Sequence, residues 1–333
     1  MMILSQLINS MTDKAVYLIP GLIALLTVLV TGPVFIPWLR KLKFGQEILE
    51  IGPNWHKSKS GTPTMGGLMF ILGVVIAMAV ALFVKFDLRL LMMVLVSVGF
   101  GLIGFVDDYV KVVKKRNLGL TAKQKFALQA ILSIVYILVL KETGSLDTNI
   151  VIPFLDKTFA MPWWLYIVFI LFVVTGTVNA VNLTDGLDGL CSSITCAVTL
   201  FFAAAGILAG DDVSAYFAMA VMGGVWGFLK FNKYPAKVFM GDTGSLFLGG
   251  AISVLAVGMK LPLLLIIVGF VYLFETLSVI IQVTSFKLTG KRVFKMSPIH
   301  HHFEMCGWKE TKIVRVFTLV TIVLCIIGYW ALI

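Results

Sequence analysis

The sequence is poor in charge and lacks paired cysteines. Only 13% of its 333 residues are charged, whereas soluble globular domains average about 25%. No two of its four cysteines are spaced as a Cys-x-x-Cys pair, so neither a disulfide framework nor a zinc knuckle is indicated. We expect no cleavable signal peptide, because the apolar run after Lys14 is too long for one and ends in a basic cluster. The composition excludes an ordinary soluble domain.

Apolar residues are abundant instead, at 59% of the chain, with a mean hydropathy of +1.00. A helix needs about 20 mostly apolar residues to cross a bilayer core. Charge, proline and glycine divide the chain into ten such runs, so we predict an all-α membrane protein with a single domain over residues 1–333. The fourth and eighth runs are short for a full crossing. The runs are Ala15–Leu39, Met65–Val84, Leu90–Val106, Phe126–Leu140, Met161–Leu183, Leu187–Ala209, Ala215–Phe231, Leu246–Met259, Leu261–Phe286 and Ile313–Ile333.

Lysine and arginine are unevenly distributed between the connecting segments. Nineteen follow odd-numbered spans and six lie in the other segments. Because cytoplasmic loops carry the excess of basic residues, we predict that the nineteen face the cytoplasm and that both termini lie outside. This bias also accounts for the net charge of +10, so no nucleic-acid partner is expected.

Asp107 and Asp108 end the third span and precede several basic residues. Adjacent helical side chains point about 100° apart, so the two carboxylates should have different partners. Asp107 and Lys111 are four residues apart, which favours a surface ion pair. A carboxylate pair where an apolar helix meets water also suits a divalent cation or a proton acceptor.

A second polar cluster ends the fifth span and contains Asn179, Asn182, Asp185 and Asp188. The acids alone would be explained as helix caps. Capping does not explain two asparagines inside an apolar span, where polar side chains are costly and usually functional. The cluster therefore predicts a ligand site.

A third cluster, between the seventh and eighth spans, contains Asn232, Phe239 and Asp242. Asp242 stands between two glycines, which allow a ligand to approach the backbone. Magnesium takes one or two protein carboxylates and leaves its other positions to water and phosphate. A simple Asp-Gly turn is the alternative for Asp242, and Phe239 is either an interfacial anchor or a stacking partner for a base.

The last polar loop carries His300, His301 and His302 in succession. Three consecutive residues cannot all reach one metal from a regular helix or strand, so a zinc site has little support. Imidazoles suit hydrogen bonding to phosphate or proton transfer. An exposed interfacial loop is the alternative.

The segment 57–67 before the second span contains Lys59 and Thr64. Free amides at a helix start attract anions, and Lys59 would add a positive charge. The alternative for this segment is an ordinary capped helix whose lysines only set the membrane topology, and the sequence fits it equally well. All of these clusters lie on the predicted cytoplasmic side, as expected for an enzyme that works at one membrane face.

In this order the motifs resemble the polyprenyl-phosphate N-acetylhexosamine-1-phosphate transferase superfamily. The strings GTPTMGG (61–67) and PIHHHFE (298–304) are similar to its phospho-N-acetylmuramoyl-pentapeptide-transferase branch. The resemblance implies a homodimer in the bacterial plasma membrane, with a ninth helix broken near Glu275. It also implies magnesium-dependent transfer of phospho-N-acetylmuramoyl-pentapeptide from its UDP-linked donor to undecaprenyl phosphate, giving lipid I and UMP for peptidoglycan synthesis.

Site roles follow from the same resemblance. It implies a catalytic set of Asp107, Asp108, Asp242 and His301, with Asp242 as the magnesium ligand. The residues that it implies for substrate binding are Lys59, Thr64, Lys111, Lys123, Asn179, Asn182, Asp185, Asp188, Asn232, Phe239, His300 and His302.

Two other functions fit parts of the sequence. A sister transferase would use UDP-N-acetylglucosamine, and the PIHHHFE string argues against it. A proton-coupled transporter would use intramembrane acids such as Glu275 and Asp107 as a relay. It would place polar groups near the membrane midplane in both halves of the chain, whereas these gather at one face.

Overall fold

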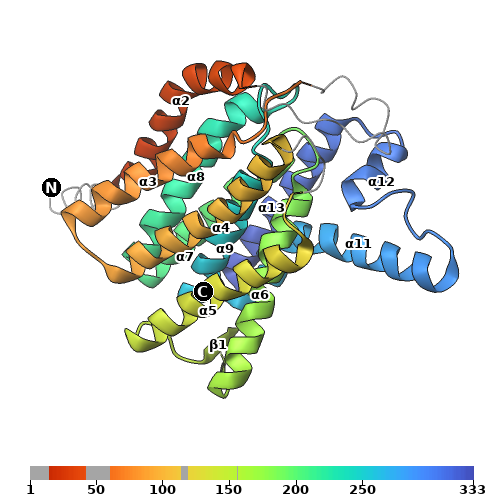
Figure 1. Cartoon of the computed structure of the whole chain (residues 1–333). Coiled ribbons are helices and arrows are strands. Elements are labelled where there is room, and N and C mark those ends of the chain that lie inside the picture. Colours follow the sequence, from red (N-terminus) through yellow and green to blue (C-terminus); the bar gives the residue numbers. More distant parts are fainter. Residues whose placement is uncertain (1–14, 43–60, 114–118, 156) are drawn as a thin grey trace, which may run out of the picture.

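The computed structural model describes residues 15–42, 61–113, 119–155 and 157–333 (Figure 1), so Lys59 lies outside the described residues. Ten described helices are long and apolar enough to cross a membrane, which confirms the predicted number of spans. These helices are α2 (Leu18–Lys41), α3 (Gly67–Val84), α4 (Leu88–Val113), α5 (Ala122–Glu142), α6 (Trp163–Thr184), α7 (Leu190–Ala209), α8 (Asp212–Asn232), α9 (Gly241–Gly258), α11 (Phe270–Thr289) and α13 (Glu310–Trp330).

Helix α9 forms the centre of the bundle, and each of its residues from Thr243 to Gly258 is buried. It packs along α4 and α6. Gly104 on α4 allows α4 and α9 to approach each other closely, because a Cβ atom at Gly104 would lie 2.0 Å from the Asp242 carbonyl oxygen. This contact brings the end of α4 against the start of α9.

The outer helices expose large apolar side chains. Val34 on α2, Phe83 on α3 and Phe172 on α6 are each more than 70% exposed. In water this surface would drive aggregation, whereas a bilayer is the solvent that it fits. The distribution is that of a multi-pass membrane protein.

Several helix ends differ from the predicted spans. Helix α4 continues to Val113 instead of ending at Val106, and α9 begins at Gly241 instead of Leu246. The two runs that looked short are full-length helices. An apolar run ends at the first charged residue, whereas the end of a helix is set by capping of its backbone. At the start of α5, for example, Thr121 and Gln124 form a capping box. Asp107 and Asp242 therefore lie within helices α4 and α9 and not in the connecting loops.

The ninth run is broken, as the resemblance implied. It forms a 3-10 helix (Pro262–Leu264), the short helix α10 (Leu265–Val268) and, after Gly269, helix α11. Figure 1 shows α11 extending away from the other helices, with α12 (Ile299–Met305) beside it. Glu275 lies in the second turn of α11.

A small β-hairpin between α5 and α6 was missed by the all-α prediction. Strand β1 (Asn149–Ile152) pairs antiparallel with β2 (Lys157–Ala160). The run of β-branched residues in β1 favours an extended backbone. Nearby, Asp147 forms an ion pair with Lys260 at 2.8 Å, which ties this connection to the end of α9.

Candidate active site

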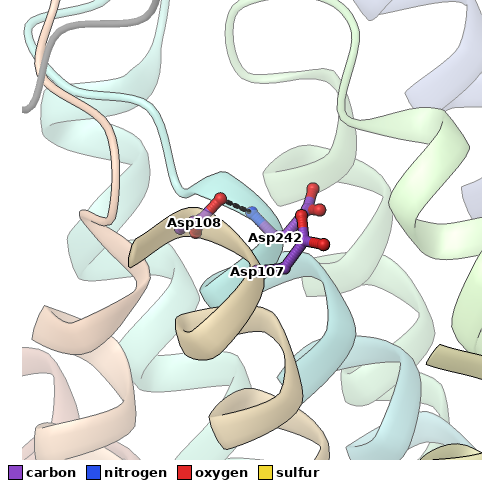
Figure 2. Close-up of side chains that lie close together, drawn as sticks. All are labelled: Asp107, Asp108 and Asp242. Carbon is purple, nitrogen blue, oxygen red and sulfur yellow. Dashed lines mark hydrogen bonds between the residues drawn. The ribbon is translucent and has the colours of Figure 1, made fainter. Parts of the chain in front are cut away.

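Three carboxylates from two distant parts of the sequence meet near the end of α4 and the start of α9 (Figure 2). Asp107, Asp108 and Asp242 each offer an oxygen atom, and these atoms lie within 4.8 Å of one another. We call these three residues the acidic centre. The structure thus brings together the acids that sequence patterns predicted.

Asp108 holds the first turn of α9. Its Oδ1 accepts a hydrogen bond from the Asp242 amide at 3.2 Å, which Figure 2 shows as a dashed line. Its Oδ2 accepts from the Thr243 amide at 2.9 Å and from the Thr243 hydroxyl at 2.7 Å. The first amides of a helix lack partners within the helix and favour negative charge, so Asp108 caps α9 from a different helix and positions Asp242.

Asp107 and Asp242 are bridged by two lysines. Lys111 Nζ lies 2.6 Å from Asp107 and 2.9 Å from Asp242, and Lys125 Nζ lies 3.0 Å and 2.8 Å from the same two carboxylates. Asp107 is fully buried and also accepts a hydrogen bond from the Leu120 amide at 2.7 Å. Asp107 and Lys111 form the ion pair that their spacing predicted, but it is not a surface pair, because the Asp107 side chain is fully buried.

Lys125 was missed, since the resemblance pointed to Lys123. Lys123 is exposed, whereas Lys125 is half-buried in the charge network. The sequence does hold a signal for it. Lys125, Gln129 and Ser133 recur every four residues and so share one face of α5, and both Gln129 and Ser133 are buried.

The acidic centre fits a hard divalent cation. All of its candidate ligands are carboxylate oxygens, which magnesium prefers over nitrogen or sulfur. The Asp242 side chain is 18% exposed, so water or a phosphate oxygen can reach it. Lys111 and Lys125 supply further positive charge within 3.0 Å.

The two asparagines on α6 both have polar partners on other helices. Asn182 donates to Asp242 at 2.9 Å and to the Ser245 hydroxyl at 2.8 Å, so it belongs to the acidic centre. Asn179, one turn earlier, donates to Gln129 at 2.9 Å and does not contact the three acids directly. Their placement explains why polar groups are tolerated in this span.

Asp188 and Asn232 fix the loops around the site. Asp188 accepts a hydrogen bond from the Ala236 amide at 2.9 Å, and its own amide donates to Glu310 at 2.5 Å. Asn232 is buried, accepts from the Ser192 hydroxyl at 2.8 Å and donates to the Val238 carbonyl at 3.1 Å. These contacts hold the segment that leads into α9.

Asp185 ends α6 and lies in the electrostatic field of the acidic centre. Burial raises the pKa of its carboxyl group well above the usual range, and the negative charges of Asp242 and Asp108 raise it further.

Thr64 lies beside Gly241 at the acidic centre. Its hydroxyl oxygen stands 2.8 Å from where a Cβ atom of Gly241 would lie, and Gly241 has a φ of +71°. Backbone pairing fixes this arrangement, because the Phe239 amide donates to the Pro63 carbonyl at 2.9 Å. The Phe239 side chain is half-buried.

The three histidines point to different partners. His300 is fully buried, with Nδ1 3.0 Å from Glu275, and its Nε2 is so close to Gly186 that a Cβ there would lie 2.2 Å away. His301 contacts Glu304 at 2.6 Å, and His302 accepts from the Lys295 amide at 3.1 Å. His300 therefore touches the loop that carries Asp185, and each of the three side chains has its own partner.

Comparisons with known proteins cover the whole of this site. The family model described as glycosyl transferase family 4 matches residues 90–260, and the phospho-N-acetylmuramoyl-pentapeptide-transferase signature 1 matches residues 59–71. A phospho-N-acetylmuramoyl-pentapeptide-transferase of Acetivibrio thermocellus is 50% identical over 91% of this chain and 92% of its own length. The same enzyme of Clostridium botulinum (strain Alaska E43 / Type E3) is 52% identical over 91% and 93%, and that of Clostridium beijerinckii is 50% identical over 99% and 100%.

Proposed function

Because this chain belongs to the phospho-N-acetylmuramoyl-pentapeptide-transferase family, we propose that its acidic centre transfers phospho-N-acetylmuramoyl-pentapeptide from UDP to undecaprenyl phosphate. The products are lipid I, an intermediate of peptidoglycan synthesis, and UMP. The observation that carries the proposal is the network of Asp107, Asp242, Lys111 and Lys125 at the end of a membrane-spanning helix.

The reaction joins two polyanions, so charge neutralisation and positioning are the main requirements. An oxygen of the lipid phosphate attacks the phosphorus next to the sugar, the bond to the uridine-bearing phosphate breaks, and UMP leaves. Lys111 and Lys125 would stabilise the negative charge on the transferred group. Magnesium, held by Asp242, would neutralise the phosphate oxygens when bound.

Asp107 is the acid best placed for chemistry. Its carboxylate faces the two lysines, while that of Asp108 is occupied by the first turn of α9. Asp107 would either accept the proton of the lipid phosphate as a base, or attack the phosphorus itself and form an acyl phosphate that the lipid phosphate then resolves. Both routes give the same products.

The nucleotide is proposed to bind beside the acidic centre, between the end of α6 and the start of α9. Asp185 would hydrogen-bond a polar group of the base or ribose, and Phe239 would stack on the base. Asn179 lines the same side. Asp188, Asn232 and His300 would act by holding the loops that form this pocket.

The cytoplasmic orientation and the homodimer are part of the proposal. The orientation is supported by the nineteen-to-six distribution of basic residues. The homodimer is supported by the family resemblance.

A substrate comparison tests the function. The purified enzyme with magnesium and undecaprenyl phosphate is given either UDP-N-acetylmuramoyl-pentapeptide or UDP-N-acetylglucosamine, and lipid product and UMP are measured. We expect one UMP for each lipid I and no product from the second donor. Turnover of UDP-N-acetylglucosamine alone would identify the sister transferase, and proton transport without turnover would favour the carrier.

A further inference from the structure

A hollow lined by none of the acidic-centre residues lies at the start of α13. Its aromatic and basic lining residues are Trp308, Lys309, Lys312 and Arg315. The Lys312 ammonium stands over the Trp308 ring at 4.0 Å from its centre, so the aromatic and basic parts of the lining are in contact.

The hollow carries three positive charges, those of Lys309, Lys312 and Arg315. Within the described residues, none of the three cations forms an ion pair, and all three are exposed. The neighbouring acid, Glu310, is directed elsewhere, because it accepts the Asp188 amide. The charge of this lining therefore favours an anion as the ligand of the hollow.

The position of the hollow indicates where that anion comes from. Helix α13 has 21 residues, about 31 Å at 1.5 Å per residue, which matches a hydrocarbon core of about 30 Å. Lys312 and Arg315 fall in its first six residues, a depth close to the lipid headgroups.

The same face of α13 continues into the lipid. At helical spacing from Lys312 and Arg315 come Leu319 and Ile326, which are 61% and 55% exposed. The opposite face, with Ile313, is buried against the protein. A molecule that occupied the hollow would thus have its polar end at the cations and its acyl chains along exposed apolar side chains.

We propose that this hollow binds the phosphate headgroup of an anionic phospholipid. The Arg315 guanidinium suits bidentate contact with a phosphate, and the two lysines add attraction to anionic lipids. Tryptophan is also enriched at the membrane–water interface. The alternative is nonspecific attraction of anionic lipids to exposed basic side chains. A defined site binds a fixed number of lipids and depends on individual residues, whereas nonspecific attraction does neither.

The test uses the purified full chain in a neutral detergent, titrated with phosphatidylglycerol or phosphatidylcholine of identical acyl chains. Native mass spectrometry counts bound lipids, and thermal melting follows stabilisation. The variant Lys312→Gln/Arg315→Gln removes two charges from the hollow. The matched control, Lys287→Gln/Lys291→Gln, removes two exposed charges at the end of α11.

We expect the native protein to retain one phosphatidylglycerol at least about tenfold more tightly than phosphatidylcholine. The hollow variant should lose this preference while melting normally without lipid, and the control should keep it. The single variant Arg315→Gln serves if the double variant does not fold. An unchanged preference in the hollow variants, or an equal loss in the control, would overturn the proposal. Equal protection by inorganic phosphate would overturn the assignment to a lipid.

Discussion

His300 on α12 and Glu275 on α11 form a buried pair, with 3.0 Å between Nδ1 and the carboxylate. The pair joins the two helices that follow the break at Gly269. On its other side the imidazole packs against Gly186, in the loop that carries Asp185. Glu275 is therefore a positioning residue, since it reaches the site only through His300.

Alanine at either position should destabilise the fold strongly. Removing one member of a buried pair costs about 3–5 kcal/mol, because the other is left unpartnered. The double variant should be less destabilised than the sum, by about 0.5–3 kcal/mol. Unfolding of Glu275→Ala, His300→Ala and the double variant in detergent measures this coupling, and strictly additive losses would contradict it. Gly186→Ala should also disturb the site, whereas Gly176→Ala, with open space around its Cβ, should not.

Asp242→Asn should abolish activity chiefly by weakening magnesium binding. An amide keeps the shape of the side chain but not the charge that holds a hard cation, so transfer should fall at least about 10²-fold at ordinary magnesium. A magnesium titration of the transfer rate, with thermal melting to confirm the fold, measures this. Asp147→Asn, which removes an exposed acid paired with Lys260, is the matched control. Normal turnover of Asp242→Asn would reduce Asp242 to a turn residue.

Lys125 should matter far more than Lys123. Lys125→Met removes a charge within 3.0 Å of both Asp107 and Asp242, and loss of one such stabilising donor lowers the rate by about 10²–10³-fold. Lys123→Met, on the same helix, changes an exposed side chain and should alter the rate little. Rates at saturating substrate decide between them, and a larger loss at position 123 would restore the assignment made from the resemblance.

Accessibility in intact cells should reveal opposite sides for two exposed loops. In a variant without the four native cysteines, Lys157→Cys on β2 should react with an impermeant maleimide, because its segment is predicted to lie outside. Lys237→Cys, in the segment before α9, should react only after the cells are opened. Both positions are exposed, so burial cannot explain a difference. The reverse pattern would place the acidic centre on the outer face.

Hydrophobic runs predicted the number of helices and their approximate centres, because a bilayer imposes a minimum apolar length. They misplaced the ends of α4 and α9, where a helix continues through Asp107 and Asp242. Helix termination depends on backbone capping, and the cap of α9 is Asp108, 134 residues before Asp242. No local pattern contains that information.

The acids of the site were predictable as residue types, but their partners were not. Lys111 could be paired with Asp107 from spacing alone, since both lie on one helix. Lys125 required knowing which face of α5 meets α4, and only the recurrence of Gln129 hints at it. The division of work between Asp107 and Asp108 likewise became visible only once α9 was in place.

Asp107 and Asp108 should respond differently to the same substitution. Asp107 faces Lys111 and Lys125, whereas Asp108 accepts three hydrogen bonds from the first turn of α9. Asp108→Asn should lower the melting temperature, because an amide supports those donors less well than a charged group. Asp107→Asn should leave nucleotide binding nearly intact. Its transfer rate should fall about 10²–10⁴-fold if Asp107 is a base, and further if it is the nucleophile.

Calorimetric binding of the nucleotide substrate, paired with single-turnover rates, separates these effects. A two-step route also predicts that the native enzyme releases UMP before any lipid phosphate is added, and that Asp107→Asn does not. A displacement in one step predicts no UMP release from either protein under that condition. If Asp107→Asn binds nucleotide poorly but turns over at the native rate once saturated, Asp107 is a binding residue. The base would then be His301, which lies 2.6 Å from Glu304, or the lipid phosphate itself.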